Sequence, residues 1–228
     1  DNVEEASLVS SMNIFSFNKL AEVVNFILGI NPYEPIKLNS TKHKISNKYL
    51  VDFKEVQGQD SAIEFVTVAA AGGHNLLMSG APGCGKSMIA KRIPTILPSM
   101  TEEEALEVTK IYSVSGLLKN RGTLISERPF RAPHHNASLN SLIGGGTFAM
   151  PGEISLSHNG VLFLDELPEF SKASLEALRQ PLEDGEVVIT RVNASLKFPS
   201  RMILVASMNP CPCGYKYDNT RNCTCSDY

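Results

Sequence analysis

The hydrophobic and polar positions divide the chain into a short helical segment, a polar stretch and a long region with alternating strand and helix signals. Between Phe17 and Leu28 the apolar residues recur at helical spacing, and Gly29 is typical of a helix end. The polar run at residues 39–48 predicts a linker. Because the chain starts abruptly, we expect residues 1–48 to be the tail of an upstream domain followed by this linker.

From Tyr49 onward, apolar runs typical of buried strands alternate with helix-period segments, which predicts a three-layer α/β fold with a parallel sheet. Thr101 and Glu104 form a capping box that opens one helix, whereas Pro94 and Pro181 are expected to weaken two others. The expected elements are strands at 75–79, 161–164 and 202–206, helices at 86–97 and 172–182 (the latter capped by Ser171), and a hairpin with strands at 186–191 and 194–198 around Val192-Asn193.

Composition indicates an ordinary soluble globular protein, since 43% of the 228 residues are hydrophobic and 20% are charged. The net charge of −3 gives no overall basic signal, so contact with nucleic acid must rest on local features. No apolar run approaches the roughly 18 residues of a membrane span. The chain begins with acidic residues where a secretion signal would be basic. We therefore expect a cytoplasmic protein.

One contiguous motif matches the P-loop pattern G-x-x-x-x-G-K-[ST] in full. The glycines allow backbone N–H groups to approach phosphate oxygens, Lys86 supplies positive charge for the β- and γ-phosphates of ATP, and Ser87 binds Mg²⁺. A chance match in a glycine-rich turn is disfavoured, because a predicted strand precedes the motif and a predicted helix follows it. Cys84 is interpreted as a small filler without chemistry of its own. The nucleotide-binding residues expected here are Gly80, Ala81, Pro82, Gly83, Cys84, Gly85, Lys86, Ser87 and Met88.

A second motif, Asp165-Glu166, follows the apolar strand at residues 161–164. A buried parallel strand would deliver both carboxylates to its carboxyl end, where open α/β sheets bind ligands. Asp165 would hold Mg²⁺ and Glu166 would polarise the attacking water, because a carboxylate committed to a metal is a poor base. Asn209, which ends the last strand, is expected to sense the γ-phosphate. The alternatives are a solvated Asp-Glu turn and an Asn that serves only the Asn209-Pro210 turn.

Four of the five cysteines form two C-x-C pairs near the end of the chain. Four thiolates meet the tetrahedral preference of Zn²⁺, and the site would be structural and closed. The alternatives are free thiols, or disulfides formed after purification. The expected ligands in this loop, residues 211–225, are Cys211, Cys213, Cys223 and Cys225.

Basic residues gather in the segment before the Asp-Glu strand, around the single acid Glu127 and with Phe130 among them. A cationic patch with an aromatic suits a nucleic-acid backbone and a stacked base. The alternative is a solvated loop whose arginines pair with carboxylates of the same domain. We expect a structural or interface role for the two adjacent histidines. The residues concerned are Lys119, Arg121, Arg128, Arg131, His134 and His135, and Arg191 and Lys197 on the hairpin are further candidate DNA contacts.

Several strings in order resemble the AAA+ ATPases, and within them the magnesium-chelatase-like family of the ComM/YifB type. The resemblance covers nearly the whole chain and is highly specific. The matching strings are Asp52-Phe53 with Val56-Gln57-Gly58-Gln59, Arg128–His135, Leu142–Gly146, Pro151–Leu156, Asp165–Phe170 and Asn209–Gly214.

The resemblance implies a hexameric ring motor associated with branch migration of DNA during natural transformation. It places Val56 and Gln59 beside the adenine, an insert in the second helix at residues 116–157, and a hairpin before the sensor strand. In related motors the insert and the hairpin point into the pore. It also implies that the upstream domain has a Lon-like fold. Two alternative functions remain: a chelatase-type motor that remodels a partner protein, and a nucleotide-gated assembly module without motor activity.

The chain ends at Tyr228, before the segment where this family places its arginine finger and its helical lid. No residue is therefore assigned to either. Because an arginine finger can be worth several orders of magnitude in rate, we expect these 228 residues alone to hydrolyse ATP weakly or not at all.

Overall fold

The computed structural model describes residues 3–9, 12–36, 49–118, 123–146, 149–191, 194–217 and 221–226. The first part of the chain contains α1 (Val3–Ala6), α2 (Leu20–Ile27), η1 (Phe53–Glu55), α3 (Asp60–Gly72), β1 (Leu76–Ser79), α4 (Lys86–Ile96) and α5 (Glu102–Val114). A middle part follows with β2 (Phe130–Arg131), α6 (Leu139–Ile143), β3 (Gly144–Gly145), β4 (Met150–Pro151), α7 (Glu153–Leu156) and β5 (Val161–Leu164). The last elements are η2 (Leu167–Glu169), α8 (Lys172–Glu176), α9 (Arg179–Asp184), β6 (Glu186–Arg191), β7 (Ala194–Pro199) and β8 (Ile203–Met208). None of the helices in these ranges is long and apolar enough to cross a bilayer.

A four-stranded parallel sheet forms the centre of the molecule, with strand order β1-β8-β5-β2. The register pairs Ser79 with Met208 and Leu164 with Ala206. The carboxyl ends of β1, β8 and β5 therefore lie side by side. This arrangement confirms the predicted α/β fold with a parallel sheet, and it positions everything that follows each strand at one edge.

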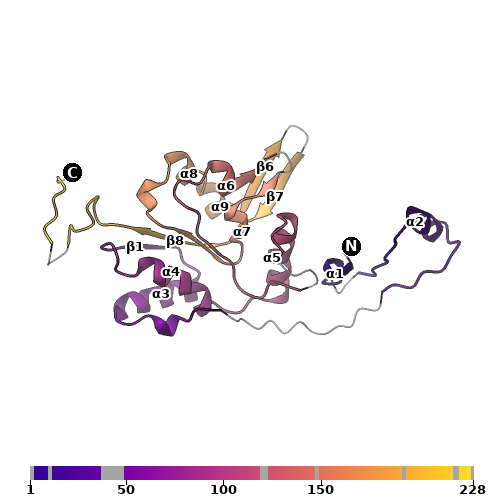
Figure 1. The fold of residues 1–228 in the computed structure, drawn as a ribbon, viewed down its shortest axis with the longest axis horizontal. Coiled ribbons are helices and arrows are strands. Elements are labelled where there is room, and N and C mark those ends of the chain that lie inside the picture. Colours follow the sequence, from indigo (N-terminus) through magenta and orange to yellow (C-terminus); the bar gives the residue numbers. More distant parts are fainter. Residues whose placement is uncertain are drawn as a thin grey trace.

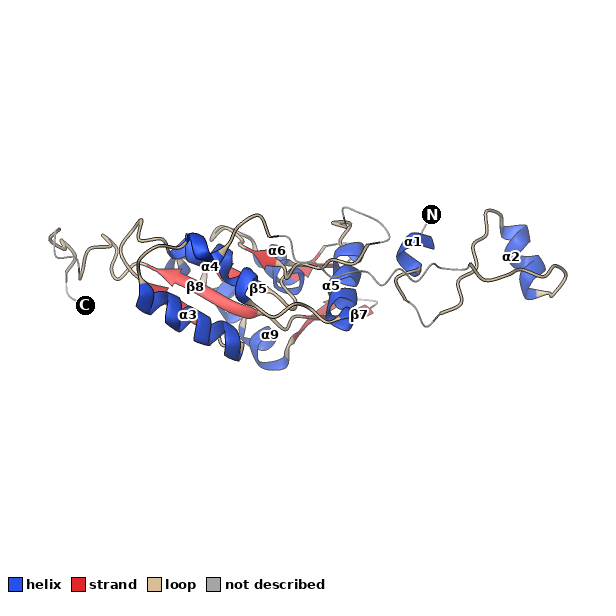
Figure 2. Cartoon of the chain, turned by 90° about the horizontal axis from the view of Figure 1, so that it is seen from below, coloured by secondary structure: helices blue, strands red, loops and turns tan. Residues whose placement is uncertain are grey.

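Helices cover both faces of this sheet, so its strands are buried from two sides (Figures 1 and 2). Along β5, Val161 and Phe163 pack into the cluster with α3 and α4, while Leu162 and Leu164 pack into the cluster on the other face. Alternate residues of a strand point to opposite faces. A strand buried on both faces must be apolar throughout, which is why the β5 sequence shows no alternation.

Most predicted elements are confirmed, and one is corrected. The helix expected at residues 172–182 is split into α8 and α9. The Ser171 side chain accepts from the backbone N–H of Ser174 as predicted, at 3.1 Å. Pro181 has no N–H to donate to the carbonyl four residues earlier, so the helix is interrupted before it. By contrast, α4 continues through Pro94 and ends two residues later.

Local capping signals were accurate elsewhere. Thr101 Oγ1 accepts from the N–H of Glu104 at 3.2 Å, and Glu104 Oε2 accepts from the N–H of Thr101 at 2.9 Å. The predicted hairpin is present as β6 and β7, which are antiparallel. Its turn, Val192-Asn193, lies outside the described residues. The predicted linker at 39–48 also lies outside them.

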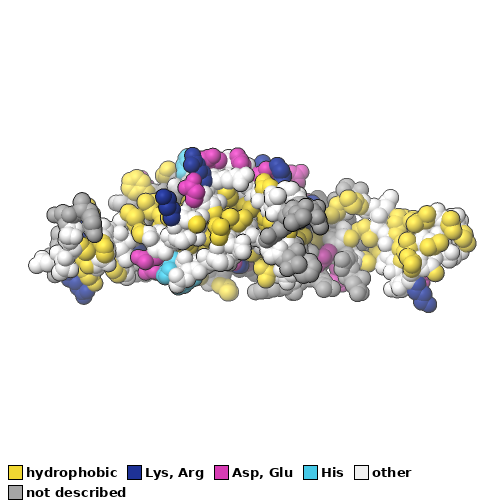
Figure 3. Space-filling model, turned by 90° about the horizontal axis from the view of Figure 1, so that it is seen from above, with side chains coloured by type: hydrophobic (Ala, Val, Ile, Leu, Met, Phe, Trp, Pro, Cys, Tyr) yellow, Lys and Arg dark blue, Asp and Glu magenta, His cyan; other side chains and the backbone are white. Residues whose placement is uncertain are grey.

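The N-terminal helices lie away from the sheet (Figure 1). The helix predicted from Phe17 begins at Leu20, and its apolar side chains are largely exposed. Leu20 is 79% exposed and Ile27 is 75% exposed. Figure 3 shows hydrophobic side chains gathered at this end of the molecule.

Candidate active site

A cavity of 340 Å³ opens at the carboxyl edge of the sheet, between the loop after β1 and the residues that follow β5 and β8. Parallel strands bring these three segments together although they are far apart in sequence. The lining residues are Pro82, Gly83, Cys84, Gly85, Lys86, Ser87, Met88, Asp165, Glu166, Ser207, Met208 and Asn209.

The loop between β1 and α4 has the backbone that its glycines predict. Gly83 has a φ of 77° and Gly85 a φ of 94°, a left-handed conformation that strains residues with a Cβ. Helix α4 begins directly at Lys86. The loop is thus a glycine turn that leads into a helix N-terminus, which is a favourable place for an anion.

Lys86 lies across this loop. Its Nζ donates to the carbonyl oxygen of Gly80 at 2.7 Å, to that of Ala81 at 3.0 Å and to Asn209 Oδ1 at 3.3 Å. The structure therefore brings together Lys86 and Asn209, two residues that the sequence assigned separately to phosphate binding. A polar atom from the residue that follows β8 and a cation from α4 therefore lie within hydrogen-bond distance of each other.

Asp165 accepts hydrogen bonds from two serine hydroxyls. Ser87 Oγ donates to Oδ2 at 2.8 Å, and Ser207 Oγ donates to Oδ1. Sequence reasoning missed Ser207, which is 1% exposed. Its signal was a polar residue near the end of an otherwise apolar strand, in register beside the residue that follows Leu164. Hydroxyl and carboxylate oxygens are the hard ligands that Mg²⁺ prefers.

Glu166 has a φ of 55°, which is uncommon for a residue with a side chain. Its Oε2 lies 3.4 Å from His135 Nδ1, and its side chain is 56% exposed. From the sequence we expected only a structural or interface role for His135. The register explains the contact: Arg131 pairs with Leu162, and four residues further along both segments His135 meets Glu166.

The other predicted nucleotide-binding residues, Val56, Gln59, Gly80 and Ala81, are not among the described residues that line the cavity. Gln59 Nε2 donates to the carbonyl oxygen of Cys84 at 2.5 Å. A Cβ at Gly85 would lie 3.5 Å from Met88 and 3.8 Å from Gln59. Val56 is 8% exposed and packs in the core with Ile89 and Ile93. That Val56 and Gln59 lie beside the adenine of a bound nucleotide stays a prediction.

Arg128 and Arg131, the candidate DNA contacts, are occupied by partners within the chain. Arg128 donates to the carbonyl oxygens of Pro98 and Asn159 at 2.6 and 2.7 Å, and it lies 3.2 Å from Glu104 Oε2.

Arg131 makes a two-point contact with Glu153, from Nε at 2.6 Å and from Nη2 at 2.7 Å. The Glu153 hydrogen bond raises the pKa of Arg131 above its usual value. Both arginines thus pair with carboxylates of the same domain, which was the alternative to DNA binding. Contact with DNA stays a prediction.

The other basic candidates are less engaged or lie outside the description. On the hairpin, Lys197 Nζ is 2.6 Å from Glu186 Oε1, and the lysine side chain is 66% exposed. The side chain of Arg191 lies outside the described residues, as do Lys119 and Arg121. The rings of His134 and His135 are in contact, with centroids 4.1 Å apart and planes tilted by 39°.

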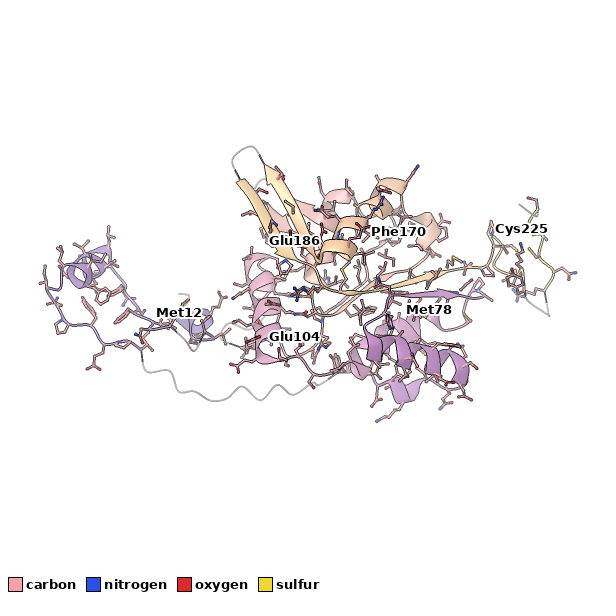
Figure 4. The ribbon with its side chains drawn as sticks, turned by 180° about the vertical axis from the view of Figure 1, so that it is seen from behind. Met12, Met78, Glu104, Phe170, Glu186 and Cys225 are labelled. Atoms are coloured by element: carbon pink, nitrogen blue, oxygen red, sulfur yellow. The ribbon has the colours of Figure 1, made fainter. Side chains whose placement is uncertain are left out.

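The four cysteines of the C-terminal loop converge, as their spacing predicted. Their ligand atoms all lie within 4.8 Å of one another. Cys211 Sγ is 3.3 Å from Cys213 Sγ and 3.7 Å from Cys223 Sγ, and the last two are 3.6 Å apart. Backbone N–H groups of Tyr215 and Thr224 lower the pKa of Cys213 to about 6. Figure 4 shows Cys225 beyond the end of the sheet.

Comparison with known proteins gives one family. Residues 52–228 match the family model for magnesium chelatase, subunit ChlI. Competence protein ComM of Haemophilus influenzae is 48% identical over 227 residues, which are 98% of this chain and 44% of ComM. YifB of Escherichia coli is 42% identical over 98% of this chain and 44% of its own length. The chain therefore spans less than half the length of these relatives.

More distant matches agree on the fold. The magnesium-chelatase 38 kDa subunit of Acidiphilium rubrum is 27% identical and covers 71% of this chain and 53% of its own length. A structure of the complex between the magnesium chelatase subunits BchI and BchD superposes with a TM-score of 0.53 at 22% identity, over 72% of this chain and 56% of that chain.

Proposed function

Because the chain belongs to the magnesium chelatase, subunit ChlI family of AAA+ proteins, we propose that it binds and hydrolyses ATP with Mg²⁺ and forms part of a ring-type motor that remodels DNA. The observation that carries this proposal is the meeting of Lys86, Ser87, Asp165, Glu166 and Asn209 around one cavity. These residues come from three separate segments, and a chance P-loop match would not assemble them.

Lys86 and Asn209 supply the phosphate contacts in this proposal. The Nζ of Lys86 donates to two backbone oxygens of the loop and to Oδ1 of Asn209, and in this proposal phosphate oxygens would replace contacts of this kind. The charge is therefore already positioned where a triphosphate would lie against the N-terminus of α4. Such preorganised charge needs little rearrangement during the reaction, which is the main source of catalysis in phosphoryl transfer.

Ser87 and Asp165 are the residues that would hold Mg²⁺, because their oxygen atoms already lie 2.8 Å apart with Ser207 on the other side of the carboxylate. The ion, when bound, neutralises charge on the phosphate oxygens. Ser207 acts as a positioning residue, since its buried hydroxyl fixes the orientation of Asp165. The hydrogen bond from Ser87 to Asp165 is the contact that an ion between them would replace.

Glu166 is the proposed base that orients the attacking water. Its carboxylate contacts His135 in this structure. A carboxylate held by an imidazole is less available to a water molecule, so His135 is expected to restrain Glu166 until the nucleotide is in place. The carboxylate of Glu166 contacts His135, whereas that of Asp165 contacts Ser87 and Ser207, and these different surroundings suit two separate roles.

DNA is the proposed polymer because ComM, a competence protein, is 48% identical over nearly the whole chain. The insert and the β6–β7 hairpin are the elements expected to face DNA in a homohexameric ring, with Arg128, Arg131, Arg191 and Lys197 as candidate contacts. The alternative of a motor that acts on a partner protein is favoured by the match to the magnesium-chelatase 38 kDa subunit at 27% identity. Residues 1–48 are the proposed tail of a Lon-like domain plus linker, and residues 49–228 the ATPase core.

Binding of a fluorescent ATP analogue with Mg²⁺ tests the first step in the 228-residue chain itself. We expect saturable binding that Lys86→Ala weakens by about 100-fold, while Lys91→Ala, an exposed lysine of the same helix, leaves it unchanged. Equal affinity in the Lys86 variant would contradict the site. ATP turnover by the protein at its natural length, with and without branched DNA, then separates the DNA motor from the partner-protein motor.

A further inference from the structure

The separations between the sulfur atoms of the C-terminal cysteines match a single tetrahedral metal ion. Four thiolates at about 2.3 Å from Zn²⁺ lie about 3.8 Å apart in a tetrahedron. The separations among Cys211, Cys213 and Cys223, which are 3.3, 3.6 and 3.7 Å, come close to this value, and Cys225 Sγ lies within 4.8 Å of these three sulfur atoms. They exceed the length of a disulfide bond, about 2.05 Å.

The donor set selects the metal and the kind of site. Soft thiolates favour Zn²⁺ over hard cations, and four protein ligands leave no open position for a substrate. The backbone N–H of Cys213 lies 3.4 Å from Cys225 Sγ, as a donor that would stabilise a thiolate. We infer that Cys211, Cys213, Cys223 and Cys225 form a structural Zn²⁺ site, and that this site holds the segment after β8 against the P-loop.

The second half of the inference follows from a close contact at Gly214. The N–H of Gly214 donates to the carbonyl oxygen of Cys211 at 2.9 Å and closes a turn around the first cysteine pair. Gly214 has a φ of 84°, and a Cβ there would lie 2.5 Å from Pro82 Cδ. The turn therefore packs directly on the phosphate-binding loop, and only glycine fits at this position.

The same segment also carries Asn209, two residues before Cys211. Because Asn209 Oδ1 accepts from Lys86 Nζ at 3.3 Å, the segment touches the P-loop region at two places, Asn209 and Gly214. A metal that fixes Cys211 and Cys213 would restrict both contacts. Loss of the metal would release the segment that carries Asn209 and Gly214 and would lower the affinity for nucleotide. This effect rests on the proposed function, whereas the metal site itself does not.

Metal content tests the site independently of nucleotide. We expect the 228-residue chain, purified without chelator, to contain about one equivalent of zinc by mass spectrometry. Cys223→Ser should reduce the content below about a tenth of an equivalent. Cys84→Ser is the matched control, because this fifth cysteine lies outside the cluster and should keep the metal. A chain that holds no zinc, or holds iron in its place, would overturn the assignment.

Nucleotide affinity then tests the link to the P-loop. Both removal of zinc with a chelator and the Gly214→Ala substitution should weaken binding of the fluorescent ATP analogue by about 5- to 30-fold, the range of a 1–2 kcal/mol change. Gly214→Ala should still contain one equivalent of zinc, so its effect is not a loss of folding. Unchanged affinity in both cases would show that the site does not act on the P-loop. If no form of the chain binds nucleotide while zinc is present, the proposed function fails and the metal site stands.

Discussion

The P-loop cavity and the Arg131–Glu153 pair of the insert both contain charged side chains, yet the structure uses the charges of Lys86 and Arg131 in opposite ways. At the cavity, Lys86 shares its hydrogen bonds among backbone oxygens and one amide, next to a space of 340 Å³. In the insert, Arg131 is held by both oxygens of Glu153, and neither side chain exceeds 29% exposure. A charged side chain beside a cavity is accessible to a ligand, whereas one that a carboxylate holds at two points is already neutralised within the fold.

The same comparison separates the two acids at the end of β5. Asp165 is enclosed by Ser87 and Ser207, whereas the Glu166 side chain is more than half exposed and contacts the imidazole of His135. The enclosed carboxylate suits a fixed metal. The exposed one suits a group that must move to meet water. In the proposed mechanism, burial rather than residue type therefore divides the roles of the two acids.

The largest expected effect comes from the movable acid. Glu166→Gln keeps the size of the side chain but removes its charge, so ATP turnover in the protein at its natural length should fall by about 100- to 1,000-fold. ATP binding should remain and bound ATP should accumulate. Glu169→Gln, an exposed acid three residues away, is the control with unchanged turnover. Turnover near the original rate in Glu166→Gln would show that Glu166 is not the base and that the cavity is not the site of ATP hydrolysis.

The next largest effect concerns Arg131, which is paired with Glu153. Arg131→Ala leaves the Glu153 carboxylate without its partner and should lower the free energy of unfolding by about 3 kcal/mol, measured by urea denaturation. Arg179→Ala, which breaks exposed pairs with Glu176 and Glu183, should change stability little.

DNA binding decides whether that pair is only structural. If Arg131→Ala, at a temperature where it is folded, lost DNA affinity with a salt slope smaller by about one, its guanidinium would be a phosphate contact. The insert and the P-loop cavity would then both use their charged side chains to bind a ligand, contrary to what the structure indicates. Unchanged salt dependence would confirm that the insert arginine serves the fold.

The smallest expected effect is at His135. His135→Ala frees Glu166 from its imidazole contact, so turnover in the absence of DNA should rise by about 2- to 5-fold, the scale of a hydrogen bond worth up to 1 kcal/mol. His134→Ala is the matched control, because His134 stacks on His135 but accepts from the N–H of Asn136 instead. Equal turnover in both variants would show that the contact does not restrain Glu166.

The sequence by itself determined the features that contiguous residues encode. The glycine turn before α4, the apolar strand before Asp165 and the capping box at Thr101 depend on local backbone chemistry, and each appears where it was expected. The C-x-C spacing also predicted that the four cysteines lie close together, since each pair holds two sulfur atoms within a short turn. The fold class followed from the alternation of these elements.

The tertiary structure alone decided which distant residues meet. Ser207 reaches Asp165 because β8 lies beside β5, and His135 reaches Glu166 because β2 is the neighbour of β5 on the other side. The sequence does not state the strand order, so neither contact could be read from spacing. The Arg131 guanidinium is paired within the fold because Glu153, at the start of α7, lies against it. Whether a charged side chain is a ligand contact or a buried pair is set by what the fold places opposite it, and that is a property of the assembled chain.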